Sequence, residues 1–531
     1  MKRRIFLQAG ATTLAAAALA RPHISQAAGT RILRYIPQAD LAVLDPVWTT
    51  AYVTRNHGLM VFDTLFGVDA SFNPQPQMVS GVDTSADGKT WTLTLRDGLK
   101  FHDGTPVLAR DCVASVQRWG KRDSFGQALM AVTDELSAPD DKTLVFKLKQ
   151  PFPLLPSALG KISTNFCPIM PERLAKTDAF TQVTEMVGSG PYRFLASERV
   201  PGARLVYERF DGYVPRPAGS PDWLTGPKIA NFDRVEWTVI PDATTAVAAL
   251  QTGQQDWWEQ PTFDLLPVLK KDPNMKLEVL DPSGSPSMLR FNHLFPPFDN
   301  PAIRRAILGA VDQSDFMTAV AGTDPGGWRD GVGYFPPGSP LASDVGMKVF
   351  EGPRDYEKVK KDLAAAGYKG EKAVVMVASD FPVLNAMGMV GADMLQKAGI
   401  AVDLQVTDWG SIVQRRASKK PPSEGGWNVF FTSFNGIDQY TPAGHLGLRG
   451  NGANGWFGWC NDPKLEELRA AWFAAPDTAA QKAIGREIQA RAFDTVPYIP
   501  IGEYFQPTAY NKSLSGIVKG CPIFWGVKKA A

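Results

Sequence analysis

The sequence contains few of the side chains on which most enzymes depend for catalysis. Only five His and four Cys occur among 531 residues. The motifs HExxH, GxSxG and GxxxxGKS/T do not occur, so the usual signatures of zinc peptidases, α/β-hydrolases and P-loop nucleotidases are missing. We therefore expect no catalytic residue, no bound metal and no cofactor.

The four cysteines are too scattered for a metal site or a thioredoxin-like motif. No two of them form a CxxC pair. Four cysteines allow three complete disulfide pairings, and sequence alone does not choose among them. The pattern indicates buried thiols or one disulfide among Cys112, Cys167, Cys460 and Cys521.

Two short motifs resemble functional sites but favour a structural interpretation. Gly450–Gly455 matches GxGxxG, yet the Trp, Phe and Gly residues at 456–459 are poor helix formers. A dinucleotide site needs a helix at that point, so we predict an Asn/Gly-rich loop. His102-Asp103-Gly104 has no second metal ligand nearby in sequence and predicts a turn.

The first residues have the pattern of an export signal. Lys2, Arg3 and Arg4 precede an alanine-rich apolar stretch at 5–20, and Ser25-Gln26-Ala27 fits a signal-peptidase site. We predict a signal peptide over residues 1–27, of the twin-arginine type, with an ordinary Sec signal as the alternative. No Cys lies near the cleavage site, so we expect a periplasmic protein without a lipid anchor.

The charge balance argues against nucleic acid or an anionic membrane as the main partner. The chain has a formal net charge of +2, and residues 1–27 hold four cationic side chains and no acidic one. Removing those four cations leaves −2. A basic patch of the kind that binds nucleic acid is therefore not expected.

Strand and helix patterns alternate along the chain. Trp91–Leu95 and Leu144–Leu148 show a period of two, and Leu99 and Phe101 continue the first alternation. A helix is expected from Pro106 to Trp119. Further helix starts are predicted at Asn300-Pro301, Asp462-Pro463 and Asp477. Pro- and Gly-rich surface loops are expected at 215–228, 323–340 and 419–426. The alternation predicts an α/β protein.

A dense set of motifs then points to one family. Between Val61 and Trp119 the chain reads DGKTWTLTLRDG at 87–98 and KFHDGTP at 100–106. GSGPY, PPFDN and VPYIP follow at 188–192, 296–300 and 496–500. In this order, the motifs resemble those of family 5 solute-binding proteins, the dipeptide, oligopeptide and nickel binders of ABC importers.

The resemblance implies a type II periplasmic-binding-protein fold, in which two ligand-binding lobes are joined by a hinge and accompanied by an extra α/β domain. By this analogy, the first lobe comprises 28–61, 188–282 and 505–531, and the second comprises 283–504. The extra domain, 62–187, carries most of the motifs. We expect the chain to cross between lobes near 280–286 and 500–506.

The implied function is capture of a di- or oligopeptide-like solute between the lobes and its delivery to the ABC permease and ATPase subunits. We expect the protein to act as a monomer. An opine, oligosaccharide, glutathione, haem or nickel-chelate ligand is also compatible with the same transport role. A periplasmic chaperone without a transport role and a secreted enzyme are hypotheses from different functional classes.

A peptide enclosed between lobes needs partners for its charged ends. In peptide-binding members an Asp in the second lobe holds the amino group, and the matching stretch here ends in Phe434, Asn435 and Asp438. Arg290 and Arg449 are candidate partners for a carboxylate. Four tryptophans are candidates for aromatic walls: Trp409, Trp427, Trp456 and Trp459.

Overall fold

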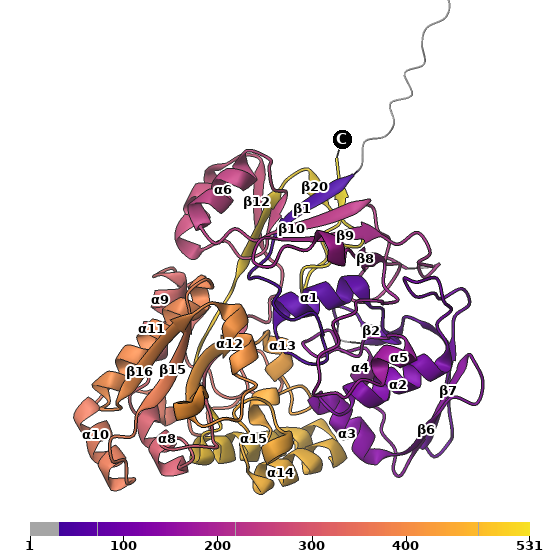
Figure 1. The fold of residues 1–531 in the computed structure, drawn as a ribbon. Helices are drawn as coiled ribbons and strands as arrows, with labels where there is room; N and C mark the ends of the chain where they lie inside the picture. The colour runs from indigo at the N-terminus through magenta and orange to yellow at the C-terminus, as the bar shows by residue number, and fades with distance from the viewer. Residues whose placement is uncertain (1–30, 72, 218, 476, 531) are drawn as a thin grey trace, which may run out of the picture. The chain divides into compact units, whose positions relative to one another are not determined.

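The chain builds three main β-sheets from strands that alternate with helices (Figure 1). The computed structural model describes residues 31–71, 73–217, 219–475 and 477–530. The predicted signal peptide, residues 1–27, lies outside this range. Across the described residues, no helix is long and apolar enough to cross a membrane.

The first sheet has seven strands in the order β12-β19-β11-β1-β10-β9-β8. Strand β1 pairs in parallel with β10 and β11, and Tyr35 faces Trp237 and Trp257 in those two neighbours. These rings and Phe524 form a buried aromatic cluster with centroids 5.0–5.7 Å apart. The strands are β1 (Ile32–Ile36), β8 (Tyr192–Phe194), β9 (Arg204–Arg209), β10 (Arg234–Thr238), β11 (Trp257–Trp258), β12 (Met275–Val279) and β19 (Pro507–Asn511).

The second sheet has six strands in the order β14-β18-β13-β17-β15-β16. Helices α9 (Gln313–Ala321) and α11 (Pro382–Lys397) pack against it and against each other (Figure 1). Strand β15 is buried throughout, which explains its unbroken apolar sequence. The strands are β13 (Ser285–Phe291), β14 (Trp328–Arg329), β15 (Ala373–Ala378), β16 (Val402–Thr407), β17 (Val429–Ser433) and β18 (Tyr498–Tyr504).

The third sheet is antiparallel, in the order β4-β5-β7-β6, and it confirms two predicted strands. These are β5 (Thr90–Leu95) and β7 (Thr143–Leu148), flanked by β4 (Val79–Thr84) and β6 (Thr133–Ser137). The continuation through Leu99 and Phe101 is wrong. Because Gly98 and Gly104 adopt positive φ, the chain turns, and only an isolated bridge joins Lys100 to Pro106.

The turn predicted at His102 is present, and the His102 side chain is hydrogen-bonded to the GSGPY motif at 188–192. Its buried ring contacts the amide nitrogen of Gly188 through Nδ1 at 3.2 Å and the carbonyl of Gly190 through Nε2 at 3.0 Å. Burial lowers the pKa of His102 to about 4, so the ring is neutral at physiological pH. A Cβ at Gly188 would lie 1.9 Å from the carbonyl oxygen of Val61, so no side chain fits there.

The predicted helix starts are confirmed. Asn300, Asp462 and Asp477 each accept a backbone N–H at the first turn of their helices. The helix predicted from Pro106 begins at Ala109 instead. The remaining helices are α1 (Tyr52–Val61), α2 (Ala109–Trp119), α3 (Ser124–Val132), α4 (Leu155–Leu159), α5 (Glu172–Ala175), α6 (Ala243–Gln251), α7 (Leu266–Lys271), α8 (Pro301–Leu308), α10 (Tyr356–Ala365), α12 (Trp409–Arg415), α13 (Gly436–Gln439), α14 (Pro463–Ala474) and α15 (Thr478–Thr495).

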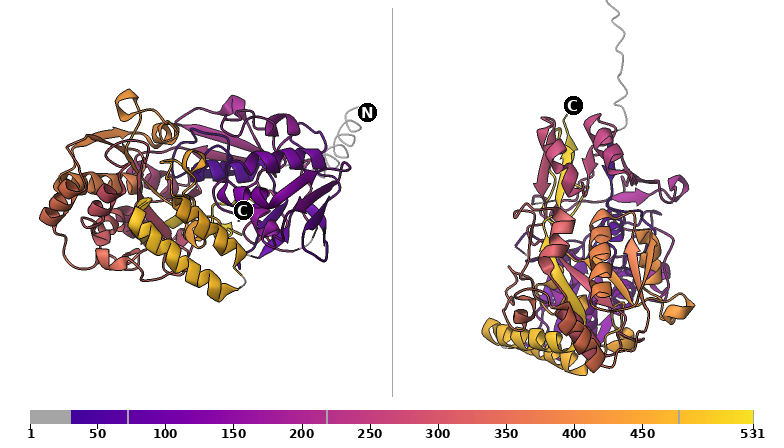
Figure 2. Two further views of the ribbon diagram at one scale, coloured as in Figure 1. Left: turned by 90° about the horizontal axis from the view of Figure 1, so that it is seen from below. Right: turned by 90° about the vertical axis from the view of Figure 1, so that its left-hand side faces the viewer.

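The chain passes between the first and second sheets at two places. It leaves β12 at Val279 and enters β13 at Ser285, and it leaves β18 at Tyr504 and enters β19 at Pro507. Figure 2 shows the second passage as a nearly continuous yellow strand. Residues 280–284 and 505–506 therefore link the two sheets, and the lobe boundaries expected from the resemblance stay a proposal.

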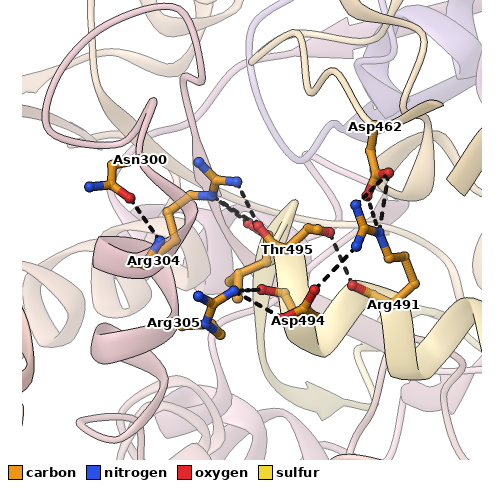
Figure 3. Close-up of polar contacts among 9 residues, drawn as sticks. Asn300, Arg304, Arg305, Asp462, Arg491, Asp494 and Thr495 are labelled. Atoms are coloured by element: carbon orange, nitrogen blue, oxygen red, sulfur yellow. Dashed lines mark hydrogen bonds and ion pairs between the residues drawn. The ribbon is translucent and has the colours of Figure 1, made fainter. Parts of the chain in front are cut away.

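A buried arginine donates hydrogen bonds to carbonyls at the C-terminal end of α15 (Figure 3). Arg304, on α8, donates to the carbonyls of Phe298, Thr495 and Val496 at 2.6–2.9 Å. Its side chain is buried. The last carbonyls of an α-helix have no N–H donor within the helix. The guanidinium of Arg304 provides donors for those at the end of α15.

Replacing Arg304 with Met should destabilise the protein by about 2–3 kcal/mol, because the freed carbonyls stay buried without donors. The neighbouring Arg305 is a matched control, since it forms a largely exposed pair with Asp494. Arg305→Met should change stability by less than about 1 kcal/mol. Urea unfolding of both variants checks this, and equal losses would contradict it.

Candidate functional site

A pocket lies where segments of the first sheet meet segments of the second, beside both chain passages. We call it the central pocket. Its lining includes Thr50, which precedes α1, Tyr52 and Arg55 in the first turn of α1, and Trp409 and Asn435 from the second-sheet part of the chain. Residues of both passages, 281 and 506, also line it. A ligand in this pocket would touch both parts at once.

Asp438 is joined to the wall of the central pocket through Tyr52, lines the neighbouring apolar cavity, and has an unsatisfied oxygen. Its side chain is only 4% exposed. One carboxylate oxygen, Oδ2, accepts a 2.5 Å hydrogen bond from the hydroxyl of Tyr52. The other, Oδ1, is buried and accepts no hydrogen bond from the described residues. Burial raises the pKa of Asp438, while Lys161, Tyr52 and Ser163 oppose the shift. A cationic donor at Oδ1 would offset the cost of burying this carboxylate.

The loop that carries Asp438 is bonded to the first chain passage. The amide of Asn435 is hydrogen-bonded to the Tyr52 hydroxyl, and its side chain donates to Asp281. Gly436 donates to the carbonyl of Gly284 at 2.8 Å. A Cβ at Gly436 would lie 1.9 Å from the carbonyl oxygen of Ser283, so only glycine allows this approach.

A polar chain beside the start of α1 includes two residues of the pocket wall, Arg55 and Glu259. Arg55 lies with its guanidinium 4.5 Å over the Tyr52 ring and donates to Asn56 at 2.9 Å. Asn56 donates to Glu259, also at 2.9 Å. Burial raises the pKa of Glu259, with hydrogen bonds and Arg55 acting against it. These contacts hold α1 in place beside β11.

Two further cavities adjoin this region. The first is an apolar pocket of about 480 Å³ that includes Asp438 and Lys161 in its lining, with Phe125, Ile437 and Trp472 among its walls. The second, which we call the cationic pocket, is lined by Trp48, Thr50, Lys121, Arg122, Phe180, Lys419, Trp456 and Trp459 among others. Thr50 lines both the cationic pocket and the central pocket.

Six of the nine residues proposed from sequence gather around these pockets. Asn435 and Trp409 line the central pocket, and Asp438 lies beside it. Phe434 is buried between the rings of Tyr52 and Trp456. Trp456 and Trp459 line the cationic pocket.

The other three proposed residues lie elsewhere. Arg290 is fully buried in β13 and donates to the carbonyls of Gly447, Phe457 and Pro497. Trp427 is fully buried against the rings of Phe430 and Trp459. Arg449 pairs with Glu466 and donates to Gln127 in α3. Because these contacts already occupy their side chains, we do not include Arg290, Trp427 and Arg449 in the proposed site.

Sequence reasoning missed Tyr52, Arg55 and Arg416. Tyr52 and Arg55 begin α1, where consecutive polar residues read as an exposed face. Arg416 stands in a basic stretch with Arg415 and Lys419, which also suggests solvent. In the structure Arg416 is buried, donates to the hydroxyls of Thr49 and Thr50, and lies over the rings of Trp409 and Phe457. No signal in a single sequence distinguishes such a buried arginine from a surface one.

Arg416, like Arg290, is a buried cation with an unpartnered guanidinium nitrogen. Among the described residues, no carboxylate forms an ion pair with it, and its Nε has no hydrogen-bond partner. Burial lowers its pKa to about 9. An anion beside Arg416 would remove much of that cost.

A titratable group lies at the second passage. Glu503, at the end of β18, is fully buried, accepts a hydrogen bond from Arg329 and leaves Oε1 without a donor. Burial raises its pKa to about 7, with Arg329 opposing and Asp281 adding to the shift. Because the pKa is higher in the folded state, Glu503 contributes stability at low pH that is lost as the pH rises towards 7.

Glu503→Gln should therefore flatten the stability profile between about pH 5 and pH 8. Thermal melts of wild type and variant across that window check this. Glu466 is the control: although burial opposes it, Arg469 and Arg449 hold its pKa below the usual value. Stability from Glu466 is thus lost as the pH falls. A Glu503→Gln profile parallel to wild type would contradict the assignment.

The described residues contain no group of three or more His, Cys, Asp or Glu side chains that could hold a metal ion. All four cysteines are free and buried. The Gly450–Gly455 segment contains a short 3-10 turn and an isolated bridge from Asn451 to Asn461, as expected for a loop.

The chain is similar to solute-binding proteins along its whole length. It is 38% identical over 537 residues to a probable peptide ABC transporter periplasmic-binding protein, y4tO, of Sinorhizobium fredii, and the match covers 100% of both chains. It is 27% identical to the glutathione-binding protein GsiB of Pectobacterium atrosepticum, over 74% of this chain and 72% of that protein.

Solved structures show the same fold. The binding protein AgaA of A. tumefaciens R10, in complex with agropinic acid, superposes with a TM-score of 0.77 at 23% identity, over 94% of this chain and 99% of that one. DppA of Helicobacter pylori, in complex with the peptide STSA, gives 0.76 at 22% identity, over 94% and 98%. The fold is thus the expected type II periplasmic-binding fold with two lobes.

The profile of the bacterial extracellular solute-binding proteins, family 5 (middle part), matches residues 73–455. This range contains the third sheet, most of the second sheet and the loop that carries Asp438. With the full-length relative above, it confirms the resemblance noted from the motifs. The chain belongs to family 5 of the bacterial extracellular solute-binding proteins.

Proposed function

We propose that the protein is the periplasmic binding component of an ABC importer and that it captures a peptide-like solute in the central pocket. The observation that supports this most is the buried Oδ1 of Asp438, which accepts no hydrogen bond from the described residues and is joined to the wall of the central pocket through Tyr52. A ligand ammonium group at this oxygen would supply the missing donor. The similarity to a probable peptide transporter component supports the same class of ligand.

The ammonium group and the carboxylate of such a solute would each have a side chain of opposite charge. Asp438 would hold the ammonium group, with Tyr52 fixing the carboxylate through its other oxygen. Arg416 lies behind Thr50 and Trp409 of the pocket wall and lacks an anionic partner of its own, so it would attract a carboxylate placed beside those residues. A charge-assisted, bidentate contact is the usual way in which Arg holds a carboxylate.

Closure would then follow from binding. Thr50 and Tyr52 belong to the first lobe, and Asp438 and Arg416 belong to the second, so a ligand touches both only when the lobes are together. Such a ligand stabilises the closed state by its differential affinity. The permease and ATPase subunits would receive the loaded, closed form. Export by the signal at residues 1–27, of the twin-arginine type and without a lipid anchor, and action as a monomer complete the proposal.

An acidic solute such as an opine or glutathione is the second candidate, in the same transport role. The positive charge of Arg416 and of the cationic pocket beside it favours such a ligand. Solved and curated relatives include proteins named for agropinic acid and for glutathione.

Native mass spectrometry of the protein purified from its own periplasm tests the proposal. We expect a bound solute that fragments as a peptide or peptide-like acid. A metal chelate, a haem or a neutral sugar would overturn the peptide assignment and leave the transport role. A protein that arrives empty would be screened against peptide mixtures, where a bound peptide raises the melting temperature, and no stabilisation by any peptide would count against the proposal.

A further inference from the structure

The cationic pocket has a cavity of about 180 Å³. Residues of the first lobe, the extra domain and the second lobe line it. Trp48 and Thr50 precede α1, and Lys121 and Arg122 follow α2. Lys419 and Trp456 come from the second lobe. A group bound here would contact segments that are far apart in sequence and would extend from the central pocket past Thr50.

Its three lining cations lack acidic partners. No Asp or Glu lines the pocket, and within the described part of the chain no carboxylate forms an ion pair with Lys121, Arg122 or Lys419. Arg122 donates to the carbonyl of Trp48 at 2.7 Å, and Lys419 donates to that of Ala453 at 3.1 Å. Neutral carbonyls satisfy hydrogen bonds but leave the positive charge uncompensated.

Two acids lie within range of Arg122 and are already engaged. Asp45 accepts two hydrogen bonds from Arg118, at 2.6 and 3.2 Å, and others from the backbone of Val47 and Val183. Asp178 accepts the backbone N–H of Phe180 and is exposed. Burial lowers the pKa of Arg122 to about 10, which agrees with weak compensation.

Aromatic rings form part of the wall. The guanidinium of Arg122 lies 4.7 Å over the ring of Phe180, and the ammonium of Lys419 lies 5.5 Å over that of Trp459. Lys121, Lys419 and the Phe180 ring are exposed, so only Arg122 is partly shielded from water. An anion beside Arg122 gains more than it would in water.

We propose that the cationic pocket receives an acidic side group of the captured solute, so that the protein favours peptide-like solutes with at least two carboxylates. This rests on the proposed function, because it assumes that the solute itself lies in the central pocket. Arg416 would hold one carboxylate, and Lys121, Arg122 and Lys419 would hold the other.

Calorimetry with isosteric peptides tests the proposal, because Glu and Gln differ only in charge. The probes are Ala-Glu against Ala-Gln, and Ala-Ala-Glu against Ala-Ala-Gln. For wild type we expect the acidic member of at least one pair to bind about tenfold tighter. Lys121→Gln and Lys419→Gln should each bring that ratio towards one. Lys420→Gln is the matched control, because Lys420 is exposed like Lys121 and Lys419 but does not line the pocket; it should keep the wild-type ratio.

Equal affinities within both pairs, or an unchanged ratio in both pocket variants, would overturn the proposal. Failure of all four peptides to bind would instead remove the peptide assignment, and glutarate then tests the pocket alone. We expect glutarate to raise the melting temperature of wild type and of Lys420→Gln but not of Lys419→Gln. No stabilisation of wild type by glutarate would overturn the pocket assignment as well.

Discussion

Asp438→Asn should weaken the binding of a solute with a free ammonium group by about 2–5 kcal/mol, or roughly thirtyfold to several-thousandfold. The exchange keeps the shape of the side chain and removes the charge that would pair with the ammonium group. The Tyr52 hydroxyl can still donate to the amide oxygen that replaces Oδ2. The expected loss therefore comes from the ligand contact and not from a rearranged loop.

The stability of the empty protein separates this role from a structural one. Burial raises the pKa of Asp438 above its unfolded value, so its ionised form costs folding free energy at pH 7. Asp438→Asn should leave the melting temperature of the ligand-free protein unchanged or higher. Asp393→Asn, at an exposed pair with Lys397, is the control for charge alone.

Calorimetry with Ala-Ala and its N-acetylated form measures the ammonium contact directly. Wild type should prefer the free amine strongly, and the variant should not. A variant that binds Ala-Ala like wild type, or that loses affinity and stability together, would remove Asp438 from the ligand site.

Lys228→Met should destabilise the protein by about 3–5 kcal/mol. Lys228 and Asp63 form an ion pair at 2.7 Å, and both side chains are fully buried. Tyr213 and the amide of Thr64 complete the bonds to Asp63. The substitution leaves this carboxylate buried without its cation, which is the costly outcome for a buried pair.

A double variant shows whether the loss of stability comes from the Asp63 carboxylate that is left buried without its cation. Lys228→Met combined with Asp63→Asn should be more stable than Lys228→Met alone, because no uncompensated charge remains. Lys147→Met breaks a half-exposed pair with Glu135 and should cost less than about 1 kcal/mol. Urea unfolding measures all three. Equal effects of Lys228→Met and Lys147→Met would contradict the prediction.

The sequence predicted helix starts and strands correctly where a few consecutive residues determine them. Asn300, Asp462 and Asp477 cap their helices as predicted, because a cap depends on three or four consecutive residues. The alternation at Trp91–Leu95 likewise gave a strand. It failed beyond Gly98, where positive backbone angles override the side-chain pattern.

Contacts across long sequence distances could not be predicted in the same way. Tyr52 is hydrogen-bonded to Asp438, 386 positions away in the sequence. No pattern in either segment predicts this contact. The loop at 215–228 was expected at the surface, yet Lys228 is fully buried. Asp438, Arg290 and Trp427 look equally suitable as sequence and all three are buried, but only Asp438 contacts a residue of the central pocket wall from the other end of the chain.

The bonds between the Asp438 loop and residues 281–284 bear on how proteins of this architecture could change their cargo. Because Gly436 tolerates no side chain against Ser283, the backbone of the loop cannot be reshaped without disturbing the passage between lobes. Lys121 and Lys419, which line the cationic pocket, are exposed and can be exchanged without moving that backbone. New specificities would therefore arise by exchanging wall residues around a fixed ammonium anchor, while the motion that reports a loaded protein to the importer is preserved.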